Sequence, residues 1–373
     1  MSGPVKYHVG AFPPKKLEWE ALIPLIGPAN AAVARYDGLL KAIPNVSVLL
    51  SPLMTQEAVL SSRIEGTQAT MGEVLEFEAE EHPANIPTEK RDDIEEILNY
   101  RKAMRHAETL LKSLPLCQRV VKEAHRVLLD GVRGHTRSPG EYRRIQNWIG
   151  SPGCSMEEAR YIPISAGALP EAISEWERYI HQDVPDQLVQ LALLHAEFEA
   201  LHPFLDGNGR LGRMLVPLFM AKNGLLSEPM FYISAFFEQN RDEYYERLLA
   251  VSRDGNWTQW VAFFLKSVVE QARDNLSRAT AILNLYESSK RLFQEITHSQ
   301  YSIQALDFLF QRPLLGSADF VAQAGIPRPT ARRILKVLRD NGILKVMRVA
   351  KGRRTGIYAY AELLNIAEGR PVL

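Results

Sequence analysis

The sequence predicts a mainly α-helical protein with few strands that ends in a basic module. Seven segments place apolar residues three and four positions apart, which is the spacing of a helix with one buried face. Segments that alternate apolar and polar residues are scarce. The chain has 373 residues, of which 46% are hydrophobic and 24% are charged. This composition is ordinary for a globular protein of two or three domains.

The elements follow from these patterns in order along the chain. Helices are expected over residues 53–60, 92–111, 115–129, 170–180, 188–201, 240–251 and 257–292. Residues 143–164 are expected to form a short hairpin with a long turn rich in Gly and Pro, and residues 345–360 a second hairpin.

Three domains are expected from the composition along the chain. An acidic stretch with prolines at 80–90 indicates a linker. We therefore expect an N-terminal helical region over 1–85, a central helical domain over 86–295 and a C-terminal module over 296–373. From residue 301 onward there are 12 Lys and Arg against 5 Asp and Glu, although the whole chain has 44 of each. Such a basic module favours polyanions as partners.

The cellular compartment is predicted from the small number of cysteines and of long apolar segments. Cys117 and Cys154 are the two cysteines, too few for a disulfide framework, which indicates a reducing, cytoplasmic location. No apolar run approaches the ~18 residues that a transmembrane helix needs. The N-terminal residues lack the pattern of a signal peptide. No membrane partner is expected.

The most informative stretch is HPFLDGNGRLGR at residues 202–213. Pro203 ends the preceding helical pattern, because a proline biases the residue before it away from the helical region. Residues 206–209 have turn chemistry, and a helical pattern resumes at Arg210. Backbone N–H groups in such a loop, at the start of a helix, form a site for anions.

The side chains of this stretch add reactive groups to the anion site. Arg210 and Arg213 are neighbours on the following helix, and guanidinium groups suit phosphate oxygens. Asp206 offers a hard oxygen ligand for Mg²⁺. His202 is placed to accept a proton from an attacking hydroxyl. Together these groups indicate phosphoryl or nucleotidyl transfer. His195 is interpreted as a packed helix residue rather than a metal ligand, because Pro203 interrupts the geometry of a metal triad.

Residues 202–213 resemble the motif of the Fic family, HPFx(D/E)GN(G/K)RxxR, without departure. The stretch GEYR at 140–143 and RYIP at 160–163 resemble the segments before and within the family's flap, and residues 244–245 and 260–265 resemble its later helices. The resemblance covers about residues 10–290. It implies a mainly helical bundle with a small β-hairpin flap.

The resemblance implies a protein adenylyltransferase, which moves AMP from ATP to a Tyr, Thr or Ser hydroxyl of a protein, the enzyme itself included. His202 would be the general base. Asp206 would hold Mg²⁺ against the phosphates. De-AMPylation by the same site stays open, as do the phosphotransfer and phosphocholine transfer known from this fold. The intact motif favours nucleotidyl transfer.

The remaining nucleotide contacts are also carried over from the resemblance. The α- and β-phosphate oxygens would bind to Gly207, Asn208 and Gly209. Arg210 would contact the β-phosphate, and Arg213 the γ-phosphate.

Two aromatic residues and the flap would complete the site. Tyr244 and Tyr245 would border the adenosine, although helix packing is an equally good interpretation of both. The flap residues Tyr161, Ile162 and Pro163 would pin the target by adding its chain as a strand.

Residues 61–66, SSRIEG, resemble the family's inhibitory motif (S/T)xxxE(G/N). Ser61 and Glu65 share one face of a helix expected over about 52–66, and Gly66 is a natural C-cap. The helix dipole mildly opposes Glu65 in the last turn, which a cationic partner would offset. The resemblance makes Arg213 that partner, so that Glu65 would deny it to the γ-phosphate.

The C-terminal module resembles a winged helix-turn-helix, with helices at 317–324 and 329–341 and a basic wing at 345–360. Candidate DNA contacts on and just before the second helix are Arg328, Arg332, Arg333 and Lys336. A protein-contact or dimerisation module is the alternative, so a homo-oligomer stays open. A nucleotide-sensing, DNA-binding regulator is the competing function for the whole chain.

Overall fold

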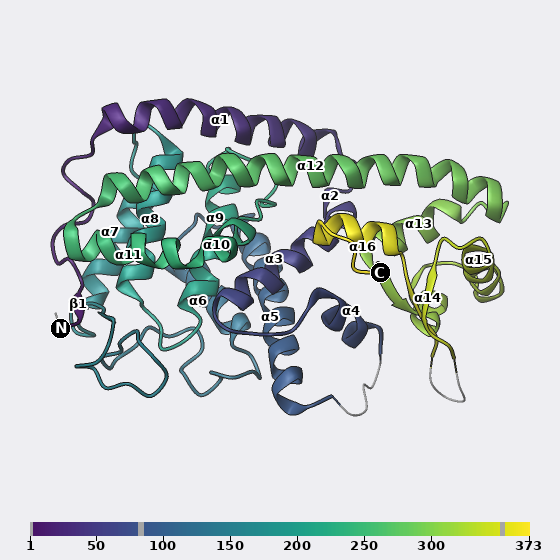
Figure 1. Ribbon diagram of the computed structural model, residues 1–373, viewed down its shortest axis with the longest axis horizontal. Coiled ribbons are helices and arrows are strands. Elements are labelled where there is room, and N and C mark those ends of the chain that lie inside the picture. Colours follow the sequence, from purple (N-terminus) through teal and green to yellow (C-terminus); the bar gives the residue numbers. More distant parts are fainter. Residues whose placement is uncertain (1–2, 81–85, 351–354) are drawn as a thin grey trace. The chain divides into compact units, whose positions relative to one another are not determined.

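The computed structural model describes residues 3–80, 86–350 and 355–373, which are mainly helical (Figure 1). The chain forms two compact units, each built from several segments. The first holds Met1–Asp37, Leu60–Gly66 and Asn99–Arg273, and the second Gly38–Val59, Thr67–Leu98 and Asp274–Leu373. The expected division was into three consecutive domains. In the described residues no helix is both long and apolar enough for a membrane crossing.

The first unit contains most of the predicted central helices. Its complete elements are β1 (Val5–Lys6), α6 (Gln118–Leu128), β2 (Tyr161–Ile162), α7 (Leu169–Ile180), α8 (Gln187–Leu201), α9 (Asn208–Lys222), α10 (Ser234–Gln239) and α11 (Arg241–Asp254). Four longer helices contribute to both units: α1 (Trp19–Ala42), α3 (Ser51–Ile64), α5 (Thr88–Leu111) and α12 (Trp257–Thr297). The sequence pattern missed α1, which contains Pro24 and Pro28, residues that usually mark helix ends.

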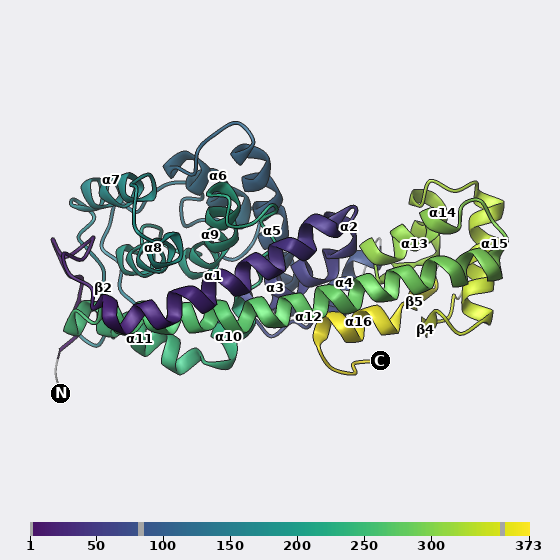
Figure 2. The same cartoon turned by 90° about the horizontal axis from the view of Figure 1, so that it is seen from above.

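The helix α8 is the centre of the first unit. All its residues except Gln187 and Glu199 are buried, which is typical of a helix surrounded by protein. It lies beside α7 and α9 (Figures 1 and 2). Trp176 donates its indole N–H to the carbonyl of Leu194 at 2.9 Å, so the α7 contact is both apolar and hydrogen-bonded. The residue that follows α8 is His202, and this packing therefore fixes its position.

The flap contains less β-structure than predicted. Within residues 143–164 one antiparallel bridge joins Ile149 to Tyr161. The strand β2 pairs instead in parallel with β1, with Val5 opposite Tyr161 and Lys6 opposite Ile162. A two-residue strand near the N-terminus has no sequence pattern that could have predicted it.

The second unit contains the C-terminal module. Its complete elements are α2 (Val46–Leu49), α4 (Met71–Ala79), α13 (Ser302–Gln311), β3 (Leu314–Gly316), α14 (Ser317–Gln323), α15 (Arg328–Asp340), β4 (Lys345–Arg348), β5 (Ile357–Ala359) and α16 (Ala361–Glu368). The strands form an antiparallel sheet in the order β3-β5-β4.

The elements of the C-terminal module lie where the sequence placed them, and the winged-helix assignment stays a prediction. Residues 81–85 of the predicted linker and 351–354 of the predicted wing lie outside the described residues.

Candidate active site

The loop between α8 and α9 is held in a conformation that few sequences adopt. His202 has a φ of 45° and Gly207 a φ of 76°, both left-handed. This region is uncommon for a residue with a side chain, so the surrounding contacts must hold His202 there. Asn208 stabilises the loop two residues further on: its side chain accepts from the N–H of Phe204 at 2.8 Å and donates to the carbonyl of Phe204 at 2.9 Å.

The inward position of the Asn208 side chain limits how this residue can bind phosphate. Its side chain is buried and bonded within the loop, so only its backbone N–H is left to bind a phosphate oxygen. The N–H groups of Asn208 and Gly209 lie in the first turn of α9, where helical N–H groups have no partner within the helix. This end of the helix attracts anions, as predicted for the motif.

His125 on α6 supports the same loop and was not predicted. Its Nδ1 accepts the N–H of Gly140 at 2.8 Å, and its Nε2 donates to the carbonyl of Asp206 at 3.0 Å. The ring stacks on Phe204 with centroids 3.7 Å apart. These partners require the neutral imidazole, and burial lowers the pKa of His125 to about 4. His125 thus fixes the main-chain carbonyl of Asp206, the residue that is the predicted metal ligand.

Arg143 is a second support that the sequence did not single out as such. It is buried, and it donates to the carbonyls of Leu201 at 3.3 Å and His202 at 3.0 Å, and also to Ile164. These first two carbonyls belong to the C-terminal end of α8, where a positive charge is favourable. Burial lowers the pKa of Arg143 to about 10, which leaves it charged at neutral pH. Asn147 adds a bond of 3.3 Å to the same His202 carbonyl.

The imidazole of His202 lines a cavity and is in the neutral form, which can accept a proton. Its Nδ1 donates to the carbonyl of Glu199 over a long 3.4 Å, which leaves Nε2 with a lone pair. Burial lowers the pKa of His202 to about 4, so the ring is neutral at pH 7. A neutral imidazole with a free nitrogen is the form that a general base needs.

The cavity has a volume of about 450 Å³, within the range of ligand sites. Its lining includes His202, Gly209, Arg213 and Tyr245 from the predicted set. Tyr244 is not part of the lining. It is buried in the core, its ring stacks on another aromatic ring, and its hydroxyl donates to His195 Nε2 at 2.9 Å. These contacts agree with the helix-packing interpretation of Tyr244, and its place beside the adenosine stays a prediction, whereas His195 is a packed helix residue as expected.

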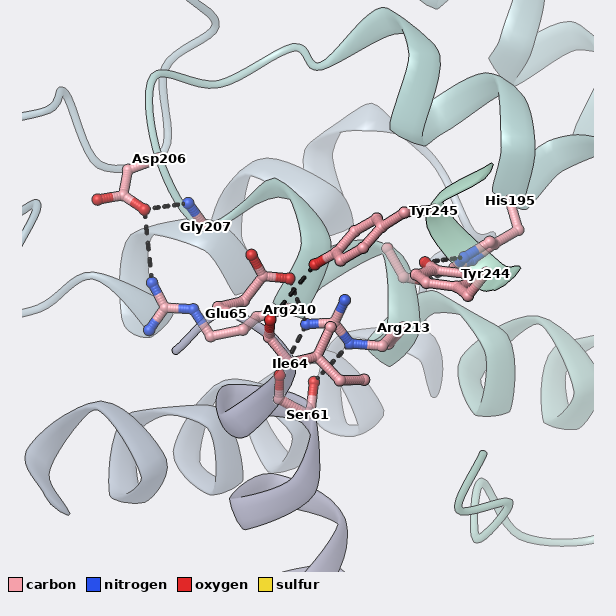
Figure 3. Close-up of polar contacts among 11 residues, drawn as sticks. Ser61, Ile64, Glu65, His195, Asp206, Gly207, Arg210, Arg213, Tyr244 and Tyr245 are labelled. Atoms are coloured by element: carbon pink, nitrogen blue, oxygen red, sulfur yellow. Dashed lines mark hydrogen bonds and ion pairs between the residues drawn. The ribbon is translucent and has the colours of Figure 1, made fainter. Parts of the chain in front are cut away.

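The predicted contact between the segment 61–65 and Arg213 is present (Figure 3). Arg213 Nη2 lies 2.7 Å from Glu65 Oε1 and 2.8 Å from the Ser61 carbonyl, and Arg213 Nε donates to the Ser61 hydroxyl at 3.0 Å. The Arg213 side chain is 1% exposed and that of Glu65 is 36% exposed. Burial opposes ionisation of Glu65, but the guanidinium outweighs it and the pKa of Glu65 is lowered. The ion pair therefore persists at neutral pH.

The carboxylate of Glu65 also lies directly on the start of α9. A methyl group added at Gly209 would come within 2.2 Å of Glu65 Oε1. The residue must therefore be glycine for the carboxylate to approach this closely. An anionic group of this chain thus occupies the place where the loop geometry favours an anion.

Asp206 fits the predicted role in holding Mg²⁺. Its side chain is 41% exposed, its Oδ1 accepts the N–H of Gly207 at 2.6 Å, and Arg210 Nη2 lies 3.6 Å from the same oxygen (Figure 3). A single accessible carboxylate beside an anion site suits Mg²⁺, which takes its remaining ligands from phosphates and water. The described residues contain no group of three side chains that would bind a metal by themselves.

Glu199 is a further residue of the cavity that the sequence interpretation missed. It lies one turn before His202 on α8 and lines the cavity. Burial raises the pKa of Glu199 to about 8, although Arg213 opposes the shift. The carboxyl group therefore holds a proton at neutral pH, and it adds no negative charge to a site for phosphates.

The flap residues are not free to pair with a target as predicted. Tyr161 is buried, and its N–H and carbonyl both bond to Ile149, at 3.0 Å and 2.9 Å. On the opposite edge, the carbonyl of Ile162 accepts the N–H of Tyr7 at 3.0 Å. The chain's own residues 5–7 therefore occupy the edge that Tyr161, Ile162 and Pro163 were expected to offer. A target strand can pair there only after this segment leaves.

The contribution of two buried histidines to the stability of the first unit is expected to fall in mild acid. Burial lowers the pKa of His125 to about 4 and that of His195 to about 3. Unfolding lets both take up protons below their ordinary pKa of about 6.5. Their contribution to stability is thus intact above that pH and declines below it. We expect His125 and His195 together to contribute roughly 3–4 kcal/mol less to the free energy of unfolding at pH 5 than at pH 7.

Urea unfolding at the two pH values measures this drop. His125→Gln removes one of the two groups and should make the dependence on pH shallower. The difference in the free energy of unfolding between wild type and His125→Gln should change by roughly 2 kcal/mol between the two pH values. An unchanged difference would rule out a buried neutral His125.

The fold and the site together define a Fic-type helical protein. A solved Fic family protein from Desulfovibrio desulfuricans matches with a TM-score of 0.58 at 18% identity, over 93% of this chain and 98% of that one. A Fic domain containing signaling protein from Bacteroides thetaiotaomicron matches with a TM-score of 0.55 at 18% identity, over 68% of this chain and 97% of that one. These likenesses show the fold.

The chain belongs to the Fic/DOC family. The model of the family's N-terminal region matches residues 23–109, and the model of the Fic/DOC family itself matches residues 115–220. Protein adenylyltransferase Fic of Drosophila grimshawi is 27% identical over 179 residues, which are 46% of this chain and 33% of that protein. The protein of the same name from Drosophila melanogaster is 28% identical over 179 residues. The chain thus matches about a third of the length of these curated relatives.

Proposed function

We propose that this protein transfers AMP from ATP to a hydroxyl group of a protein, and that Glu65 restrains the reaction. The observation that carries the proposal is the neutral imidazole of His202, which faces a cavity whose wall holds Gly209 and Arg213. A proton acceptor, a helix N-terminus and a buried cation converge there, which is the set that nucleotidyl transfer needs. The family relatives named protein adenylyltransferase support the same reaction class.

In this mechanism His202 Nε2 takes the proton of the attacking hydroxyl. The hydroxyl oxygen forms a bond to the α-phosphorus, the bond from that phosphorus to the bridging oxygen breaks, and pyrophosphate leaves. The backbone N–H groups at the start of α9 hold phosphate oxygens as charge builds on them. Mg²⁺ beside Asp206 would neutralise phosphate charge. Arg213 contacts the γ-phosphate once Glu65 has released it.

The position of the transferred label tests this function. The Glu65→Gly variant, with Mg²⁺, is incubated with ATP radiolabelled at the α-phosphate or at the γ-phosphate, and the protein is separated from nucleotide. Label from the α position should stay on protein, whereas label from the γ position should not. Transfer of the γ label would identify a phosphotransferase, and the absence of both labels, from this protein and from added lysate proteins, would reject the proposal.

A further inference from the structure

The helix α15 presents a stripe of exposed cations beside its buried face. Ala331, Ile334, Leu335 and Leu338 are buried. The exposed stripe follows helical spacing and consists of Arg328, Arg332, Lys336 and Arg339. At a rise of about 1.5 Å per residue it is roughly 16 Å long.

Most of this charge is uncompensated within the described part of the chain. Arg339 lies 2.7 Å from Asp340 and is neutralised by it. The structure pairs none of Arg328, Arg332 and Lys336 with a described acidic side chain. Three cationic side chains clustered on one helix attract a polyanion more strongly than the same number dispersed over the surface.

The stripe forms one wall of a groove rather than a flat surface. The groove has a volume of about 430 Å³ and lies between α14, α15 and β5. Ser317 and Tyr358 contribute hydroxyl groups to it, and its described lining contains no acidic residue. Cations and hydroxyl groups are the side chains that bind phosphate and sugar oxygens in nucleic-acid complexes.

Arg333, which was also predicted as a DNA contact, does not line this groove. Its Nη1 donates to the carbonyl of Thr297, at the end of α12, at 2.7 Å. This bond directs the side chain toward α12. Arg333 therefore offers a matched control on the same helix.

We propose that the stripe on α15 binds the phosphates of double-stranded DNA, a second activity beyond the transfer of AMP. A helix is about 10–12 Å wide, and the major groove of DNA, about 12 Å wide, admits one. The major groove of double-stranded RNA is too narrow for side chains to read. Val346 and Met347 on β4 are exposed, so a membrane is the alternative that a vesicle control tests.

The test is the salt dependence of duplex binding by the full chain. Anisotropy of a fluorescent random-sequence duplex is titrated with wild type and with the double variant Arg332→Ala/Lys336→Ala between about 50 and 200 mM salt. Each phosphate contact contributes about 0.9 to the slope of log affinity against log salt. The double variant should lose about 2 from the size of that slope and weaken binding at least about tenfold at low salt.

The controls separate this proposal from its alternatives. Arg333→Gln should leave both the affinity and the slope unchanged, and thermal melting verifies that each variant is folded. The stripe residues are also absent from the catalytic cavity, so AMP transfer by the double variant should stay the same. Three results would overturn the proposal: no duplex binding at low salt, an unchanged slope in the double variant, or equally tight binding to single-stranded RNA or to anionic vesicles.

Discussion

Replacement of His202 by alanine is expected to lower AMP transfer by about 10²–10⁴-fold, the usual contribution of a general base. The measurement uses the Glu65→Gly background, so that the loss is not hidden by inhibition. The reason is geometric: His202 lines the cavity, its Nδ1 donates to the carbonyl of Glu199, and its Nε2 keeps a lone pair for the incoming proton.

The matched control for this variant is His181→Ala. His181 is an exposed histidine that follows α7 and does not line the catalytic cavity. This variant should transfer AMP at the unaltered rate. A His202→Ala variant that kept more than about a tenth of the activity would remove the general-base role.

The pH profile gives an independent check on His202. Its pKa of about 4 means that the neutral, proton-accepting form dominates throughout the range from pH 6 to pH 8. The rate should therefore change little between pH 7 and pH 6 and should fall only in stronger acid. A midpoint near the ordinary histidine pKa of about 6.5 would show that burial does not shift this ring in the working enzyme.

Replacement of Glu65 by glycine is expected to raise AMP transfer by about 10–100-fold. Hydrogen bonds to charged groups stabilise by about 1.5–3 kcal/mol, and a difference of 1.4 kcal/mol is about tenfold. The partial exposure of Glu65 places the pair at the lower end of this range. Glu65 follows Ile64, the last residue of α3, so glycine there costs the helix little.

The conservative variant Glu65→Gln distinguishes inhibition by the negative charge of Glu65 from inhibition by the size of its side chain. Glutamine fills the same space on Gly209 and bonds to Arg213, but it lacks the negative charge. We expect an activation smaller than that of Glu65→Gly. If both variants transfer AMP at the wild-type rate while ATP is bound, Glu65 is not an inhibitor.

The sequence predicted the part of the site that is local in the chain. The loop of residues 202–213 has its helix ends, its glycines and its cations in one window, so their proximity needed no knowledge of the fold. The contact of Glu65 with Arg213 crosses a long separation, and the resemblance to the family motif indicated it. The helical segments were also predictable, because apolar residues recur three and four positions apart within each of them.

The residues that were missed act through distant backbone groups. His125 and Arg143 bond to carbonyls near residue 202, and no pattern around either side chain identifies such partners. Tyr244 and Tyr245 were given one role because adjacent positions cannot be oriented without the fold. The structure turns Tyr244 into the core and Tyr245 toward the cavity. The pairing of β1 with β2 could not be predicted, because a strand of two residues is too short to show an alternation of apolar and polar residues.

The central claim is that Glu65 and the γ-phosphate compete for Arg213. Titration calorimetry with Mg²⁺ and either ATP or ADP, on wild type and on Glu65→Gly, measures this competition directly. The account predicts that the variant binds ATP about tenfold or more tightly than wild type does. ADP binding should tighten less, because ADP gains the N–H groups that Glu65 covers at Gly209 but has no γ-phosphate to contact Arg213. Equal tightening for both nucleotides, or for neither, would contradict it.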